Sequence, residues 1–477
     1  MKRQALLAAA IALGSCSSDG RGHGAEDGGG RADAGGGADS GPDAAGDSGD
    51  SGVSVPGPSI VCAARFGEPD GFEIVEAVAV DLTGAVYLVG RFEALLRVGD
   101  DVLEGTAGMS TVFVARLDAT CIPVWARTVP GATAASVSAG TDGAILAGDF
   151  REEIDLEPAG TLVARGERDG FVARMTSEGA FEWATQLGSP ADDGVDAVAA
   201  DGAAAYVYGR LGSIDPAALS LVRLEADGGI AWQREFEWMR PGGLAVGGDG
   251  TAFFVGGANG RGSPDFGGGP LAGGGESATF VVAIGSDDIH RWSRRFDVFA
   301  TEWEDERYRI AVAPTGELTL AGGVYDGTVD FGGGAVVQDG SFVVVGLDGD
   351  GGHVSSRSYR ATAPHSGLSA VAVDSEGARL FAGGQTGGVD FGGGELGAIG
   401  NPGGGAFIAK LNASGDHVWS ALYDGGNRFM SLGVAGDGAA VAAGQLSGTM
   451  DLGDRVLETA GGEGSDDDDA LVIRFAP

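Results

Sequence analysis

The stretch FIAKLNASGDHVWSALYDGG, residues 407–426, decides the fold of this 477-residue chain, because variants of it recur along the sequence. It contains an apolar strand, a turn rich in Gly and Asp, and a second strand around Trp419. Seven equivalent positions lie 49–64 residues apart: Cys62, Trp125, Trp183, Trp232, Trp292, Ser355 and Trp419. Seven copies of one unit therefore fill residues 58–477.

Each unit has four strand-like segments. After the Trp strand and a loop, an apolar segment such as EAVAVD (76–81) leads into a tight turn with Asp and Gly. The next segment, such as AVYLVG (85–90), is apolar on both faces and must be buried on both. A longer loop and a segment such as FVARL (113–117) complete the unit. This pattern predicts an all-β fold, a seven-bladed β-propeller of four-stranded blades.

The phase of the repeat predicts how the ring closes. The repeats begin on a Trp-type strand, residues 60–66, and end on a third-type strand, residues 471–475. The last blade therefore lacks its outer strand. We expect the N-terminal strand to supply it, because an open ring would leave an unpaired sheet edge.

The letters Asp-Phe-Gly occur at 265–267, 330–332 and 390–392, each time followed by two more glycines. In protein kinases these letters carry a magnesium-binding aspartate, but a kinase also needs a strand lysine and a catalytic-loop aspartate. The chain has only two lysines, Lys2 and Lys410. We predict a repeated structural turn, with Phe between blades and Gly permitting the bend.

The units, among them FIAKLNASGDHVW (407–419) and GVAGDGAAVAAG (433–444), resemble the bacterial β-propeller repeat family labelled SBBP. The resemblance covers almost all of residues 58–477. It implies the propeller fold and no particular activity.

The N-terminal residues predict export. Lys2 and Arg3 precede the apolar run 5–13, which is shorter than the ~20 residues that span a bilayer. The run ends in Leu-Gly-Ser-Cys, which resembles the lipobox of bacterial lipoproteins. By that resemblance, residues 1–15 are a signal peptide and Cys16 is lipidated and anchors the chain in a membrane. Ser17 then favours the outer membrane. A plain secretory peptide with an incidental cysteine is the alternative.

Residues 16–57 consist, after Cys16, almost entirely of Gly, Asp, Ala and Ser, and we expect a disordered tether there. The formal net charge of −38 excludes nucleic acid and anionic lipid surfaces as partners. It permits cations, cationic peptides and sugars. The alternative is that the acidic surface serves solubility alone.

The sequence contains no complete catalytic set. His290, His353 and His417 occupy one repeat position just before the Trp-type strand, so we interpret them as structural. His-Glu-x-x-His and Cys-x-x-Cys zinc motifs are absent. We therefore assign no catalytic residue, no metal ligand and no cofactor, and leave calcium binding by the acidic loops open.

Two unusual loops mark a candidate ligand surface: EWMRPG (237–242) and VFATEWEDERY (298–308). Tryptophan beside carboxylates and arginine suits contact with a sugar or a peptide. The alternative is that both Trp side chains pack against the blades. The candidate ligand-binding residues are Trp238, Arg240, Trp303, Glu304, Asp305 and Arg307, with His365 and Arg428 in equivalent loops.

Cys62 and Cys121 are the only cysteines besides Cys16. An even pair in an oxidising envelope invites a disulfide. However, we place Cys62 in the last blade and Cys121 in the turn before the outer strand of the first. Adjacent outer strands splay apart, and a bridge needs Cα atoms within ~7 Å. Buried free thiols are therefore the expectation, and a disulfide is the alternative.

Together these features predict a lipid-anchored binding or interaction module of the bacterial outer membrane, facing the periplasm or the cell surface. Its ligand would be an envelope protein or a glycan. The alternative is a glycan hydrolase or lyase on a propeller scaffold, with Glu304 and Asp305 as paired carboxylates.

Overall fold

In the computed structural model of the chain, the described residues are 57–69, 71–105, 110–140, 142–211, 218–237, 239–259, 263–273, 277–300, 308–322, 327–338, 342–361, 367–385, 387–397, 404–462 and 467–477. The predictions on the signal peptide, Cys16 and the tether fall outside them. Over the described part of the chain, no helix combines the length and apolarity needed to cross a bilayer.

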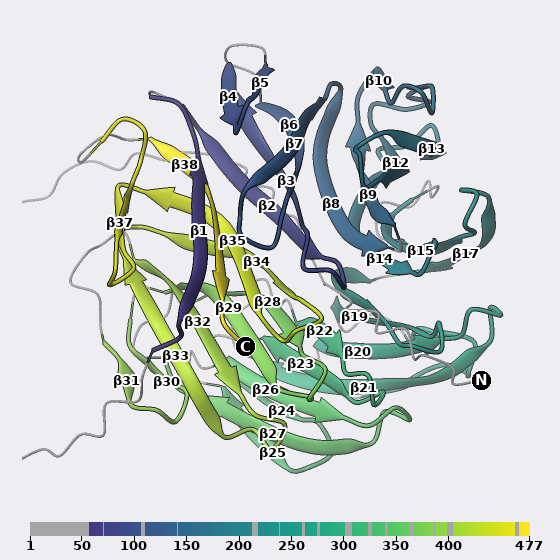
Figure 1. The fold of residues 1–477 in the computed structure, drawn as a ribbon. Helices are drawn as coiled ribbons and strands as arrows, with labels where there is room; N and C mark the ends of the chain where they lie inside the picture. Colours follow the sequence, from purple (N-terminus) through teal and green to yellow (C-terminus); the bar gives the residue numbers. More distant parts are fainter. Residues whose placement is uncertain are drawn as a thin grey trace, which may run out of the picture. The chain divides into compact units, whose positions relative to one another are not determined.

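The described residues form the seven predicted four-stranded antiparallel blades (Figure 1). Six blades are separate four-stranded sheets, and the sheet of blade 4 is extended to six strands by a hairpin that follows the second strand of blade 5. Blade 1 consists of β2 (Glu73–Val80), β3 (Val86–Glu93), β6 (Ser110–Leu117) and β7 (Pro123–Val129). Blade 2 consists of β8 (Ala132–Gly140), β9 (Gly143–Phe150), β12 (Asp169–Thr176) and β13 (Phe181–Leu187). Blade 3 consists of β14 (Gly194–Asp201), β15 (Ala204–Arg210), β16 (Leu219–Leu224) and β17 (Ile230–Phe236).

The remaining blades repeat this order. Blade 4 consists of β18 (Arg240–Val246), β19 (Ala252–Asn259), β20 (Ser277–Ile284) and β21 (His290–Ala300). Blade 5 consists of β22 (Arg309–Val312), β23 (Leu318–Gly322), β26 (Phe342–Leu347) and β27 (His353–Tyr359). Blade 6 consists of β28 (Gly367–Val373), β29 (Arg379–Gln385), β32 (Gly405–Leu411) and β33 (His417–Asp424). Blade 7 consists of β34 (Arg428–Val434), β35 (Ala440–Ser447), β38 (Asp468–Phe475) and β1 (Ile60–Phe66).

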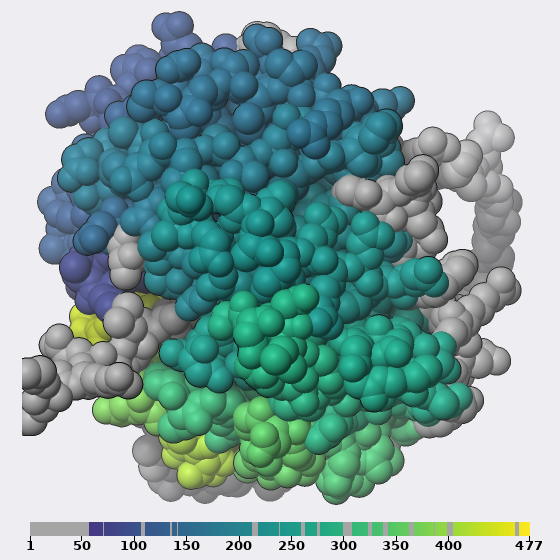
Figure 2. Space-filling model, turned by 90° about the vertical axis from the view of Figure 1, so that its right-hand side faces the viewer, coloured from purple at the N-terminus to yellow at the C-terminus, as the bar shows by residue number. Residues whose placement is uncertain are grey.

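The first strand of each blade lies at the inside of the ring, where β2 is beside both β8 and β34. Short hairpins enter between the second and third strands of five blades: β4 (Leu95–Val98) with β5 (Asp101–Glu104), β10 (Glu153–Asp155) with β11 (Thr161–Val163), β24 (Gly327–Asp330) with β25 (Ala335–Gln338), β30 (Val389–Asp390) with β31 (Glu395–Leu396), and β36 (Thr449–Asp451) with β37 (Val456–Glu458). Figure 2 shows successive blades side by side, from blue through teal to green.

The ring closes as the repeat phase predicts. The N-terminal strand β1 pairs antiparallel with β38, with Arg65 opposite Leu471, and so becomes the outer strand of blade 7. In Figure 1 the purple β1 runs beside the yellow β38. This pairing removes the free sheet edge that an open ring would expose.

Apolar layers between neighbouring blades form the core. Tyr87 on β3 belongs to one layer with Leu146 of blade 2, whereas Leu88 belongs to the opposite layer with Val441 of blade 7. All four residues are 0% exposed. The second strand of a blade is therefore buried on both faces, as its uninterrupted apolar sequence predicts.

The Asp-Phe-Gly segments are turns, as predicted. Asp330 Oδ1 accepts hydrogen bonds from the backbone amides of Gly332 (2.7 Å) and Gly334 (3.0 Å), while Phe331 is 1% exposed. Gly332 and Gly334 have φ of 102° and 106°, values that disfavour other residues. A Cβ on Gly333 would lie 2.1 Å from His353 Cε1, so the imidazole occupies the space that this glycine leaves. The equivalent turns at 265–269 and 390–394 have the same contacts.

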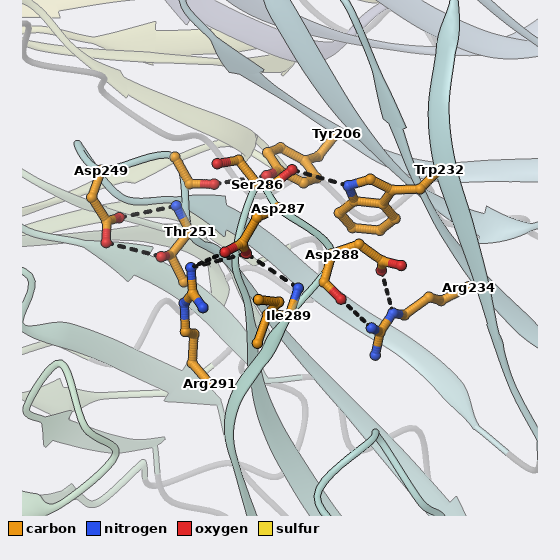
Figure 3. Close-up of polar contacts among 11 residues, drawn as sticks. Tyr206, Trp232, Arg234, Asp249, Thr251, Ser286, Asp287, Asp288, Ile289 and Arg291 are labelled. Carbon is orange, nitrogen blue, oxygen red and sulfur yellow. Dashed lines mark hydrogen bonds and ion pairs between the residues drawn. The ribbon is translucent and has the colours of Figure 1, made fainter.

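Four outer-strand tryptophans join their blades to the next, from blade 1 through blade 5. The indole N–H of Trp232 donates to the Ser286 carbonyl at 3.2 Å, in the turn between β20 and β21 (Figure 3). Trp183 likewise donates to Ala226 at 2.9 Å. A Cβ on Gly228, two residues further along that turn, would lie 2.6 Å from the Trp183 ring. The indole therefore packs on the left-handed position of the next blade's turn, and Trp125 and Trp292 repeat the arrangement.

At the seam between blades 7 and 1, a disulfide takes the place of this contact. Cys62 stands at the Trp position and Cys121 stands at the left-handed turn position, with φ of 62°. The two cysteines are bonded, with their Cα atoms 5.9 Å apart. The expectation of free thiols is therefore wrong. That expectation compared the positions of two outer strands. Cys121 lies instead in the turn at 118–122, which contacts β1 of blade 7 in the same way that the turns of other blades contact a Trp ring.

This seam is also the place where the chain is discontinuous. In the other blades a tight turn joins the third strand to the outer strand, but in blade 7 the two strands come from opposite ends of the repeats. A backbone hydrogen bond from Ala476 N to Ser59 O (2.8 Å) stands where the turn would be. The disulfide therefore links β1 covalently to blade 1. Within blade 7, no turn connects β1 to β38.

Candidate functional site at the N-terminal ends of the inner strands

Two of the predicted ligand-binding residues are described, and both lie at the same end of the ring. Arg240 is the first residue of β18 and Arg428 is the first residue of β34, and both side chains are exposed. Arg428 lies over blade 6, because a Cβ on Gly384 would be 3.0 Å from its Cγ. The other predicted residues lie outside the described ranges, and their grouping stays a prediction: Trp238, Trp303, Glu304, Asp305, Arg307 and His365.

Arg309, which the sequence analysis did not select, connects three blades near this end. It lies on β22 and is 5% exposed. Its Nε donates to the Ser369 carbonyl of blade 6 at 2.8 Å, and its Nη1 lies 3.5 Å from the Gly242 carbonyl of blade 4. Ser369 and Gly242 are bulged positions of their strands, so their carbonyls are free of ladder pairing at that point. We assign Arg309 a structural role.

A group of buried carboxyls extends along this end over blades 7, 1 and 2. Burial raises the pKa of Glu76 even though Arg91 is paired with it at 2.7 Å. Burial likewise raises the pKa of Asp149, despite its ion pair with Arg168 at 2.9 Å. Perturbed carboxyls grouped at one end of a fold are a common mark of functional sites. This group is therefore a second candidate site, beside the predicted loops.

The most perturbed carboxyl is Glu73, at the seam between blades 7 and 1. It is 0% exposed, and neither of its carboxylate oxygens has a hydrogen-bond partner. Burial and the neighbouring Asp469 raise its pKa to about 8. The Glu68 backbone amide lies near enough to oppose this shift in part, but it does not reach the distance and angle of a hydrogen bond. Asp469 is also 0% exposed and pairs with Arg65 at 2.9 Å, but its Oδ1 has no partner.

At the seam between blades 2 and 3, the equivalent carboxylates have hydrogen-bond donors. Parallel bridges between Phe72 and Asp468 and between Arg168 and Asp192 mark the two seams as equivalent. Asp169 corresponds to Asp469 and accepts from three donors: Arg165 N (3.2 Å), Gly166 N (3.1 Å) and Gln186 Nε2 (2.5 Å).

Asp193 in turn corresponds to Glu73. It accepts from the amide (2.6 Å) and the hydroxyl (2.9 Å) of Ser189. In the loop at the 7/1 seam, Glu68 follows the first glycine. In the loop at the 2/3 seam, the residue at that position is Ser189. A further carboxylate therefore stands at the 7/1 seam where the 2/3 seam has a hydroxyl donor. The donor shortage at Glu73 is therefore a property of this seam and not of the fold.

The buried carboxyls can hold a proton or a small cation, but Glu73 and Asp469 cannot contact a large substrate. Across the described ranges, no group of three or more His, Cys, Asp or Glu side chains could by itself hold a metal ion. A sequence signal for the acidic seam did exist: the acidic run 466–469 directly precedes the apolar strand 470–475.

No family model and no curated protein sequence matches this chain. Solved structures of similar fold include the Dos1 propeller, with a TM-score of 0.40 and 8% identity over 88% of this chain and 95% of that one. Chaetomium thermophilum Sqt1 bound to the N-terminus of ribosomal protein L10 has a TM-score of 0.36 and 12% identity over 82% and 98%. The phage phi92 endosialidase has a TM-score of 0.32 and 10% identity over 87% and 68%. None of them bears on the function.

Proposed function

We propose that this protein is an exported, lipid-anchored propeller that binds an envelope protein or a glycan at the N-terminal ends of its inner strands. The observation that carries the export proposal is the Cys62–Cys121 disulfide, because disulfides persist in oxidising compartments outside the cytoplasm. The lipobox-like sequence before Cys16 supports the same address independently.

Cell fractionation tests the proposed cellular location. The wild-type chain is expected in the outer-membrane fraction, with an acylated Cys16 as its first residue. Cys16→Ala should release the chain from the membrane, because no acyl chain would remain to anchor it. Ser17→Asp is the matched control, which should stay anchored but shift toward the inner membrane. A wild-type chain in the cytosol that still begins at Met1 would contradict the proposal.

The exposed Arg240 and Arg428 support the binding surface, since both lie at the end of the ring where the two unusual loops were predicted. We expect Trp238→Ala and Trp303→Ala to weaken binding to purified envelope glycans or to a cross-linked envelope protein. Leu82→Ala is the control, because Leu82 is 57% exposed in the turn at the other end of β2. Binding that survives both Trp substitutions would contradict the proposed surface.

The same experiment separates binding from catalysis. If the full chain turns over an envelope glycan, Glu304→Ala and Asp305→Ala should abolish that turnover without lowering the Tm. That result would replace the binding module by the glycan hydrolase or lyase. If turnover is absent and the Trp variants lose binding, the module stands.

A further inference from the structure

Three acceptor oxygens converge beside Gly71 in the loop that crosses from blade 7 to blade 1. A Cβ on this glycine would lie 2.4 and 2.8 Å from Glu73 Oε1 and Oε2, and 2.8 Å from the Glu68 carbonyl oxygen. The Glu68 carbonyl accepts a hydrogen bond from Gly71 N at 3.1 Å, whereas the two oxygens of the Glu73 carboxylate have no donor. The glycine is required because these oxygens occupy the space of a side chain.

The charge at this seam is also unbalanced. Glu73, Asp467 and Asp469 are 0%, 6% and 0% exposed, and each has at least one carboxylate oxygen without a partner. Among the described residues, Arg65 is the cation that pairs with this group, through Asp469. Burying an anion without a partner is costly, and native proteins resolve such sites by neutralising the charge with a proton or an ion.

A single proton would not complete the site. On Glu73 it could be donated to one neighbouring carboxylate oxygen, which serves two of the four oxygens in this group, but the other two would still have no partner. A cation with several coordination positions can accept all of these oxygens together with water. Carboxylates and carbonyls are the ligands of hard cations, and flexible coordination with retained waters is typical of calcium.

We propose that the seam between blades 7 and 1 binds one divalent cation of the calcium class, with Glu73 and Asp469 as its protein carboxylate ligands. Asp467 contributes negative charge beside them, and water with main-chain oxygen completes the shell. The equivalent seam between blades 2 and 3 needs no ion, because backbone amides, Gln186 and Ser189 already supply its donors.

The site has a structural consequence that is separate from the proposed binding function. It lies where β1 and β38, from opposite ends of the repeats, meet the first inner strand. A bound cation would therefore join both terminal strands to blade 1 at one end of the seam, in addition to the disulfide. Removal of the ion should loosen this seam before any other.

Titration calorimetry with CaCl2 and thermal melts of the full chain, after EDTA treatment and dialysis into ~0.1 M NaCl, test the proposal. The salt screens weak association with the acidic tether. The wild type should bind one Ca²⁺ at a site that Glu73→Gln weakens at least about tenfold. Its Tm should rise by a few degrees at about 100 times Kd. Mg²⁺ should bind more weakly, because it demands stricter geometry and dehydrates reluctantly.

Asp193→Asn, at the equivalent position of the 2/3 seam, is the matched control and should keep calcium affinity within about twofold. In calcium-free buffer Glu73→Gln should melt no lower than the wild type, because it removes a buried charge that has no partner. Asp469→Asn provides a second variant with the same expected loss of calcium affinity. The proposal is overturned if the wild type binds no Ca²⁺ up to about 10 mM, above the range of extracellular calcium modules. It is equally overturned if Glu73→Gln binds as tightly as the wild type.

Discussion

The substitution of a disulfide for a Trp–turn contact leads to a quantitative prediction. Cys62 and Cys121 are separated by 59 residues. Closing a loop of that size restricts the unfolded chain by about 4 kcal/mol in the chain-entropy treatment. Cys62→Ser with Cys121→Ser should therefore lower the free energy of unfolding by up to about 4 kcal/mol. The first strand to lose protection should be β1, because no turn joins it to β38.

Hydrogen exchange followed by mass spectrometry gives the local readout, and calorimetric melts give the global one. We expect faster exchange in residues 60–66 and 470–475 of the double Ser variant, with the inner strands of blades 3 and 4 unchanged. The reasoning is refuted if β1 exchanges as slowly without the disulfide as with it. It is also refuted if protection falls equally in every blade, because the bridge would then have no local role.

Other copies of the repeat suggest a pair of residues that could replace the disulfide. Cys62→Trp with Cys121→Gly recreates the pair found at three other seams, where the indoles of Trp125, Trp183 and Trp292 pack on left-handed glycines. This variant should regain roughly 2–3 kcal/mol through burial of the indole and should be insensitive to reductant. The converse change, Trp183→Cys with Gly228→Cys, should form a second disulfide under oxidising conditions. Failure of both exchanges would show that the two arrangements are not equivalent.

Three further outcomes are expected, each measured as a change in unfolding free energy. Asp330→Ala should cost about 1–2 kcal/mol, because two backbone amides of the glycine turn lose their acceptor; Asp330→Asn, which keeps one acceptor oxygen, should cost less. Gly333→Ala should destabilise by placing a methyl group 2.1 Å from His353 Cε1, and His353→Ala in the same chain should relieve most of that loss. In EDTA, the contribution of Glu73 to the free energy of unfolding should be fully present below pH 4.5 and should be lost as the pH rises toward 8. This follows because the folded-state pKa of Glu73, about 8, exceeds its ordinary value of 4.5. The loss should be at most about 5 kcal/mol. Glu73→Gln should flatten this dependence, and an equally steep dependence in that variant would assign it to other groups.

The repeat made the fold predictable. Seven recurrences of the strand around Trp419 set the number of blades, and the phase of the first and last strands set the closure by β1. Both are local patterns, which a single sequence displays directly. The Asp-Phe-Gly segments could be interpreted for the same reason, since three copies of one turn argue against a single catalytic loop.

The candidate site was less predictable, because it depends on contacts between residues far apart in the sequence. Glu73 and Asp469 come from opposite ends of the repeats, and nothing near either one shows that the other is its neighbour. The disulfide was missed for a different reason. Cys121 stands where most other copies have glycine and Cys62 where most have tryptophan, so aligning both positions together would have indicated the pairing.

We propose that this chain is an exported propeller, and its N-terminal strand is fixed to the first blade by a disulfide. Mass spectrometry of the protein isolated from its own cells under thiol-blocking conditions can test both points in one experiment. We expect an acylated N-terminus at Cys16 and a peptide pair linked through Cys62 and Cys121. An unprocessed chain that begins at Met1, with both of those cysteines alkylated as free thiols, would contradict it.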